Sequence, residues 1–172
     1  PMNKQVWIEK ALGLGIQEFE IYQSTTVEKE MTWFQGQMDT LVSSKVTGTS
    51  IRGIVDGKMA NMALEEIDDS MCETVLKSLI EQAQIISNEE TDSLRKPEPI
   101  EYVKKDVTWN MASTEYVKDI LQSLEAKLLA YDPRVIQVGY LGYSQGSGSR
   151  SIVNSLGMDV QDADEMQYIV AS

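Results

Sequence analysis

Few side chains in this chain could carry chemistry, and the most versatile kind is absent: none of the 172 residues is a histidine. Histidine is the usual general base, the usual metal ligand and the orienting member of hydrolase triads. Cys72 is the only cysteine, and it lies near the predicted start of a helix, where the helix dipole lowers a thiol pKa. The carboxylates of Asp68, Asp69 and Glu73 would raise that pKa again, and no imidazole can activate the sulfur. We therefore expect Cys72 to be a small core or boundary residue.

Two acidic segments have enough carboxylates to hold a hard cation. The first, residues 65–69, precedes a predicted helix, where acidic side chains cap free amides and complement the helix dipole without a metal. The second consists of Asp159, Asp162, Asp164 and Glu165, which alternate poorly and resemble a solvated loop. We predict no metal site in either segment.

Two further features have a possible role in binding. The glycine- and serine-rich segment 142–149 lacks the lysine and the following helix of a phosphate-binding loop, so we interpret it as a mobile hairpin connection. Trp33 and Phe34 stand beside a predicted turn. Trp33 shares the face of Met31 and is expected in the core, whereas Phe34 points the other way and is a candidate for contact with a partner or peptide.

The charge balance restricts the partners. Fifteen basic and 27 acidic residues give a net charge of −12, which repels phosphate backbones and anionic lipid surfaces. We therefore expect no direct binding to nucleic acid or membrane. Apolar runs are far shorter than a membrane span of roughly 20 residues, and no signal-peptide pattern is present. A single cysteine fits a reducing compartment, and we expect a cytoplasmic protein.

The elements that position these residues mix helices with strands. Helices are predicted over 7–12, 68–87 and 113–131, because apolar residues recur there every three or four positions, and Ser113 is a suitable N-cap for the third helix. Three or four short strands are predicted between residues 19 and 64, with tight turns at 35–37 and 56–57 and an interruption at Gly48. Later strands are expected over 135–143, 150–153, 158–161 and 168–172. The pattern predicts an α+β fold with a mainly antiparallel or mixed sheet and amphipathic helices packed on it.

Three apolar stripes define the expected helical part of the core. They consist of Trp7, Ile8, Ala11 and Leu12; of Ile67, Met71, Val75, Leu79, Ala83 and Ile86; and of Val117, Ile120, Leu121, Leu124, Leu128 and Tyr131.

The chain divides into two subdomain-like halves. Residues 88–110 are polar and contain Pro97 and Pro99, which disfavour helix. We expect this stretch to be a linker between 1–87 and 111–172. The last strand, 168–172, has no turn or cap after it, so we expect the chain to stop before a C-terminal domain.

Several segments together resemble one protein family. They are the strand Phe19-Glu20-Ile21-Tyr22, the turn region from Phe34 to Asp39, the run from Gly48 to Lys58 with the helix after it, and the turn Asn154-Ser155-Leu156-Gly157. This order is similar to the N-terminal domain of the TldD/PmbA family, also called modulators of DNA gyrase. The fit is better to the PmbA (TldE) side.

The resemblance implies a two-domain cytoplasmic protein that assembles as a dimer. TldD members carry zinc in an HExxxH motif and cleave peptides, whereas PmbA members lack that motif and act as partner subunits. Because this sequence has no histidine, zinc is implied only for a TldD-type partner, and no cofactor, catalytic or metal-binding residue is expected here.

The leading hypothesis is a non-catalytic N-terminal domain of a PmbA-like subunit of a TldD/PmbA-type metalloprotease. It would shape a peptide-binding chamber and contact a TldD-like or identical subunit. Arg52 and Phe34 are the candidate contact residues, and strand addition is the expected mode for a peptide or unfolded segment. The alternative is a stand-alone acidic interaction module that modulates DNA gyrase by imitating nucleic acid.

Overall fold

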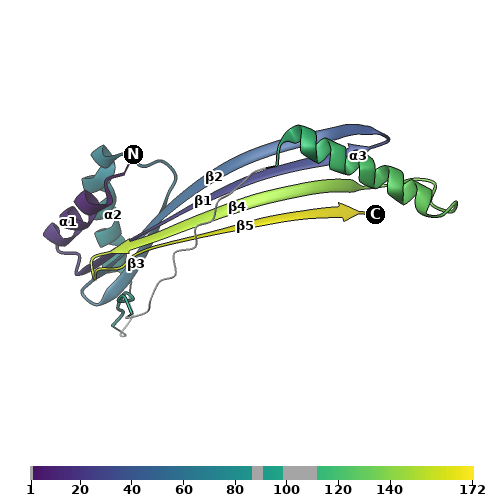
Figure 1. The fold of residues 1–172 in the computed structure, drawn as a ribbon. Helices are drawn as coiled ribbons and strands as arrows, with labels where there is room; N and C mark the ends of the chain where they lie inside the picture. Colours follow the sequence, from purple (N-terminus) through teal and green to yellow (C-terminus); the bar gives the residue numbers. More distant parts are fainter. Residues whose placement is uncertain (1, 87–90, 99–111) are drawn as a thin grey trace. The chain divides into compact units, whose positions relative to one another are not determined.

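The computed structural model describes residues 2–86, 91–98 and 112–172. Its helices are α1 (Lys4–Gly13), the short 3-10 helix η1 (Asp69–Met71), α2 (Cys72–Ile85) and α3 (Thr114–Tyr131). Its strands are β1 (Glu18–Phe34), β2 (Gln37–Val55), β3 (Lys58–Leu64), β4 (Leu141–Asn154) and β5 (Asp159–Ala171). The strands form one sheet in the order β3-β2-β1-β4-β5 (Figure 1).

The sheet is antiparallel. β2 and β3 pair from Thr49 opposite Leu64 to Val55 opposite Lys58. Both early hairpins turn through residues with positive φ, Gln35 and Gly36 at 49° and 80° and Asp56 and Gly57 at 50° and 76°, as the two-residue turns preferred by twisted strands require. The predicted α+β class and both predicted turns are confirmed.

The chain folds into two compact units that share the long strands. Unit 1 consists of Pro1–Thr25, Thr47–Lys104 and Ser149–Asp162, and unit 2 of Thr26–Val46, Lys105–Gly148 and Ala163–Ser172. Each unit has its own apolar core. The domain boundaries predicted from the sequence, at residues 87 and 111, stay a prediction.

Helices α1 and α2 supply much of the unit 1 core. Asn3 caps α1 by accepting a hydrogen bond from the Val6 amide at 3.3 Å, and Trp7, Ile8 and Ala11 are buried as predicted. The core residues come from both helices and the adjoining strands, namely Trp7, Ile8, Ala11, Ile16, Phe19, Ile21, Ile51, Val55, Ala60, Cys72, Val75, Leu76, Leu79 and Ala83.

Two predicted stripe residues of unit 1 are exposed, Leu12 and Met71. Met71 ends the 3-10 turn before α2, so the helical period starts one residue later and buries Cys72 and Leu76 instead. Ser87, the predicted end of this helix, lies outside the described residues.

Helix α3 packs on the strands of unit 2. Ser113 caps it, with its hydroxyl accepting a hydrogen bond from the Tyr116 amide at 3.2 Å, as expected. Val117 and Leu121 are buried against Met31, Trp33, Val138, Leu141 and Tyr143. Tyr131, predicted on this stripe, is 86% exposed, because the last turn of the helix extends past the core.

The buried carboxylate of Glu125 was not anticipated. It accepts hydrogen bonds from the Trp33 indole at 3.3 Å and from the Gly36 amide at 2.9 Å. One α3 side chain therefore holds both the core tryptophan and the β1–β2 turn. Trp33 is buried, as predicted.

The strands are longer than predicted. Gly48 lies inside β2, the serine- and glycine-rich residues 144–149 lie inside β4, and the acidic residues 162–165 lie inside β5. The predictions of an interruption, a mobile connection and a solvated loop are wrong there. β4 lies between β1 and β5, so pairing on both sides overrides the weak strand preference of serine and glycine. The strand predicted over 135–143 begins only at Leu141.

The expected linker 88–110 falls largely outside the described residues. Its described part, 91–98, has no helix or strand, but Leu94 is buried and the Asp92 amide donates to the Gly57 carbonyl at 2.9 Å. No helix among the described residues is long and apolar enough to cross a membrane.

Gly53 of β2 offers a test of the unit 1 packing. A Cβ atom there would lie 2.9 Å from Leu79 and 3.0 Å from Ile16, whereas at Gly48 the nearest atom is the Ser24 hydroxyl at 3.4 Å. We expect Gly53→Ala to lower the free energy of unfolding by about 1–3 kcal/mol through overpacking. Gly48→Ala, the control, should change it by less than about 1 kcal/mol. Urea unfolding followed by tryptophan fluorescence measures both, and equal stability of the two variants would contradict the packing described.

Candidate functional site

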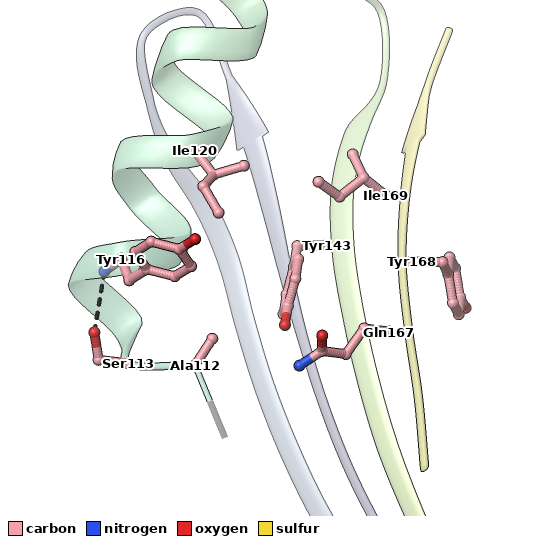
Figure 2. A pocket seen from close by; sticks show the side chains of 8 residues that line it. All are labelled: Ala112, Ser113, Tyr116, Ile120, Tyr143, Gln167, Tyr168 and Ile169. Atoms are coloured by element: carbon pink, nitrogen blue, oxygen red, sulfur yellow. Dashed lines mark hydrogen bonds between the residues drawn. The ribbon is translucent and has the colours of Figure 1, made fainter. Parts of the chain in front are cut away.

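Unit 2 contains a groove of about 830 Å³ between the start of α3 and strands β4 and β5. Figure 2 shows α3 on one side and the two strands on the other. Its lining residues are Ala112, Ser113, Tyr116, Ile120, Tyr143, Gln167, Tyr168 and Ile169. Aromatic and aliphatic surface with a few polar groups is typical of sites that bind organic ligands or peptide side chains.

Tyr143 is the buried member of the groove. It lies on β4 among the unit 2 core residues, and burial raises the pKa of its hydroxyl above the ordinary value. The hydroxyl stays protonated at neutral pH and donates to Gln145 Oε1 at 2.9 Å. Gln145 is 3% exposed, and its Nε2 has no hydrogen-bond partner within the described part of the chain. A buried amide donor without a partner costs free energy.

The β5 side of the groove is an open sheet edge. β5 is last in the strand order, and the Tyr140 and Ser172 backbones exchange two hydrogen bonds of 2.9 Å on its inner side. Met166, Tyr168, Ile169 and Val170 are exposed. An exposed edge strand with large apolar side chains is a template for pairing with another extended chain.

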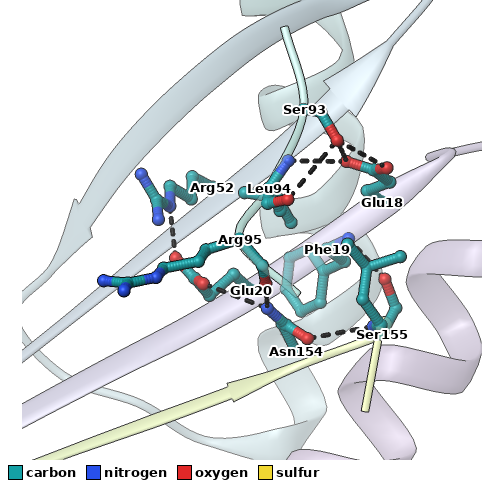
Figure 3. Close-up of polar contacts among 10 residues, drawn as sticks. Glu18, Phe19, Glu20, Arg52, Ser93, Leu94, Arg95, Asn154 and Ser155 are labelled. Atoms are coloured by element: carbon teal, nitrogen blue, oxygen red, sulfur yellow. Dashed lines mark hydrogen bonds and ion pairs between the residues drawn. The ribbon is translucent and has the colours of Figure 1, made fainter. Parts of the chain in front are cut away.

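Unit 1 contains a second polar cluster, centred on Glu20 (Figure 3). Glu20 lies on β1, is 3% exposed and forms an ion pair with Arg52 of β2. Asn154 Nδ2 donates to Glu20 Oε1 at 3.3 Å and to the Arg95 carbonyl at 2.9 Å. Asn154 Oδ1 accepts from the Leu156 and Met158 amides at 2.9 and 3.1 Å.

The cluster also fixes the segment 91–98. Glu18 Oε2 accepts a hydrogen bond from the Leu94 amide at 2.8 Å, and the Ser93 hydroxyl donates to the same carboxylate. Next to Asn154, the Ser155 hydroxyl accepts from the Phe19 amide at 2.9 Å, and the Ser155 amide donates to the Phe19 carbonyl at 2.8 Å. Because both carboxylates of this cluster are engaged, we interpret it as support for the fold.

The acidic residues that precede α2 form hydrogen bonds within unit 1. The described residues hold no group of three or more Asp, Glu, Cys or His side chains that could bind a metal, and the sequence has no histidine. Asp68 accepts a hydrogen bond from the Ser70 amide, and Asp69 accepts from the Asn3 amide and the Trp7 indole, both at 2.9 Å. The predicted capping role is confirmed for Asp68, which caps η1, whereas Asp69 bonds to residues of the α1 region and α2 itself has no side-chain cap.

The two predicted contact residues lie in different units. Phe34 is half-buried at the end of β1 in unit 2, and it does not line the groove. Arg52 belongs to unit 1, where its guanidinium pairs with Glu20. Their role in binding stays a prediction.

Sequence reasoning missed the groove itself. Tyr143 and the segment 168–172 were placed on strands, but their proximity to Tyr116 follows from the pairing of β4 with β5 and from the position of α3. The detectable signal was Tyr116, an aromatic residue off the apolar stripe in the first turn of α3.

Cys72 is buried in the unit 1 core, as predicted. Desolvation by burial is the main cause that raises the pKa of its thiol, so the reactive thiolate is scarce at pH 8. We expect a thiol reagent at pH 8 to modify the native protein at least tenfold more slowly than the urea-unfolded protein. Equal rates in the two states would show that Cys72 is accessible.

Asn154 is the residue on which the polar cluster of unit 1 depends. We expect Asn154→Ala to lower the free energy of unfolding by about 3 kcal/mol, because at least two partly or fully buried partners lose a hydrogen bond at about 1–3 kcal/mol each. Asn61→Ala, on the exposed surface of β3, is the matched control and should be nearly neutral. Denaturant titration measures both, and a neutral Asn154→Ala would contradict this role.

Comparisons with known proteins agree on one family. The model of PmbA/TldA metallopeptidase domain 1 matches residues 19–86, and that of the PmbA/TldA metallopeptidase central domain matches 108–172. No curated protein sequence matches the chain.

Solved structures share the fold at low identity. A candidate modulator of DNA gyrase from Thermotoga maritima is 19% identical with a TM-score of 0.81, covering 98% of this chain and 38% of its own. TldE from Thermococcus kodakarensis is 19% identical with a TM-score of 0.77, with coverages of 96% and 38%. A candidate modulator of DNA gyrase from Bacteroides thetaiotaomicron is 18% identical with a TM-score of 0.75, with coverages of 97% and 39%.

The chain thus spans less than two fifths of the length of these structures. Because the two family models together match more than half of its residues, the chain belongs to the PmbA/TldD metallopeptidase family, with residues in that family's first and central domains.

Proposed function

We propose that this chain is a non-catalytic part of a PmbA-like subunit and binds an extended peptide at the outer edge of β5. In a full assembly it would wall a peptide chamber and contact a TldD-like or identical subunit, and zinc is implied only for a TldD-type partner. The observation that carries this proposal is the groove beside an open strand edge in unit 2. A family of metallopeptidases needs a surface that holds an extended polypeptide, and an aromatic and aliphatic groove next to an unpaired strand edge supports this role.

Strand addition explains how such a site binds without many specific side chains. The backbone of an added peptide pairs with the free N–H and C=O groups of an edge strand, and alternate side chains enter pockets. Here the edge belongs to β5, and the pocket is walled by Tyr116 and Ile120 of α3 and floored by Tyr143. A large apolar side chain of the peptide would occupy the space between them.

The charge of β5 sets a preference among peptides. The strand contains Asp159, Asp162, Asp164 and Glu165 and no lysine or arginine. Within unit 2, Glu165 directly precedes a segment whose Met166, Tyr168, Ile169 and Val170 are apolar. A peptide that carries a basic residue next to apolar ones would match this order of charges and apolar side chains.

The absence of histidine makes turnover by this chain alone unexpected. Incubating the purified chain and an unfolded polypeptide with zinc should therefore give no cleavage. Cleavage that persists after extensive purification would contradict the non-catalytic assignment.

Tyr116 gives a direct test of the groove, since α3 carries a second tyrosine, Tyr131, outside it. The probe is a fluorescent, unstructured peptide of about twelve residues with alternating apolar side chains and one lysine. We expect Tyr116→Ala to weaken its binding about tenfold, as removal of an aromatic contact typically does. Tyr131→Ala should leave the affinity unchanged, and fluorescence anisotropy measures both.

Two N-methylated forms of the same peptide separate strand addition from side-chain binding alone. In each form every second backbone amide is methylated, so that one form is blocked on one edge of the extended peptide and the other form on the opposite edge. Methylation on one edge of the peptide removes the hydrogen bonds that would face β5 and should abolish binding. Unchanged binding of both methylated forms would contradict strand addition. Unchanged binding to Tyr116→Ala would contradict the use of this groove.

A further inference from the structure

The other open edge of unit 2 belongs to β2. β3 pairs only with Thr49–Val55 of β2, so the earlier part of that strand has no neighbour on its outer side in the described residues. Every residue from 37 to 46 is exposed, and the large apolar side chains among them are Met38, Leu41, Val42 and Val46. A nine-residue edge, 38–46, is thus available for pairing.

The sequence of this edge is complementary to itself. In an antiparallel pair centred on Val42, Asp39 of one copy lies opposite Lys45 of the other, and symmetry repeats the pair. Met38 then lies opposite Val46, Thr40 opposite Ser44, and Val42 opposite its own copy. Shifting one strand by two residues relative to the other removes both charge pairs. Shifting it by one residue places the apolar side chains of the two copies on opposite faces of the paired strands.

Asp39 and Lys45 are available for this contact. The ion pairs among the described residues involve neither of them, and both side chains are exposed. Opposite charges on directly facing residues stabilise an antiparallel pair, whereas like charges destabilise it.

We propose that β2 binds a second copy of this chain through residues 38–46, in antiparallel register centred on Val42. The edge of β5 does not fit this role, since it contains carboxylates and no cation that could face them. The two edges of unit 2 therefore differ in their partners. Dimer assembly with an identical subunit belongs to the proposed function, and this proposal rests on it only for the kind of partner: it assigns the surface and the register, and it does not depend on peptide binding at β5.

An edge lysine can also act in the opposite way, by keeping strands of different copies apart. The two roles predict different results for the same substitution. If Lys45 keeps copies apart, removing its charge increases association. If Lys45 pairs with Asp39, removing its charge decreases association.

Charge exchange tests the register. We expect Asp39→Lys and Lys45→Asp to weaken self-association about tenfold each, because every substitution changes two symmetric attractive pairs into two repulsive ones. The double variant Asp39→Lys/Lys45→Asp restores opposite charges and should recover the association of the parent chain. Sedimentation velocity across a concentration series, without peptide, measures all four proteins. A parent chain that stays monomeric up to about 1 mM, or a double variant as weak as the single ones, would overturn the proposal.

A cysteine at the centre gives a second test that does not depend on charge. Val42 lies opposite itself in the proposed pair, so Val42→Cys should form a disulfide-linked dimer under mild oxidation. Thr40→Cys is the control, because residue 40 lies opposite Ser44 and two Thr40→Cys thiols are offset along the strands. The native Cys72 is buried and should not react. Equal crosslinking of the two variants would contradict the register, whatever the result at β5.

Discussion

An antiparallel sheet that does not close on itself leaves the outer backbone groups of two strands without a partner inside the sheet. In unit 2 these strands are β2 and β5. Their unpaired backbone groups are the constraint from which the other features of the unit can be understood. One edge carries a balanced pair of opposite charges among apolar residues, and the other carries only acidic charges followed by apolar residues. Both edges thus offer free backbone N–H and C=O groups, and the proposed difference between their partners rests on the difference between their side chains. Helix α3 covers one face of the strands and contributes the wall of the groove, and in the proposed function it would add side-chain contacts to backbone pairing at the β5 edge.

Each unit contains a buried glutamate that joins distant segments of the chain. Glu20 in unit 1 is held by Arg52 and Asn154, and Glu125 in unit 2 holds the Trp33 indole and the Gly36 amide. A buried carboxylate is tolerated only when donors surround it, and in both places those donors come from segments far apart in the sequence. The turn Asn154-Ser155-Leu156-Gly157 gains its importance in this way: Asn154 connects the β4–β5 turn to β1 and to the segment 91–98.

The sequence was sufficient for the features that depend on neighbours along the chain. Helix periodicity, the caps at Ser113 and Asp68, and the turns at Gln35-Gly36 and Asp56-Gly57 were predicted because each is decided within a few residues. The length of the strands was not, since Gly48 and the serine- and glycine-rich residues of β4 have weak strand preferences and are extended only because neighbouring strands pair with them. The groove was missed for the same reason: Tyr116 and Ile169 are distant in sequence, and only sheet order and helix position bring them together. Glu20 and Glu125 were missed because alternation and periodicity alone do not reveal a carboxylate with buried donors.

The burial of Cys72 has a consequence for how the chain responds to acidity near neutrality. The sequence has no histidine, the side chain whose ordinary pKa lies closest to neutrality, and burial raises the pKa of the Cys72 thiol above its ordinary value. A change in activity or cohesion near neutral pH, in an assembly that contains this chain, would therefore not arise from an imidazole or from the Cys72 thiol of residues 1–172.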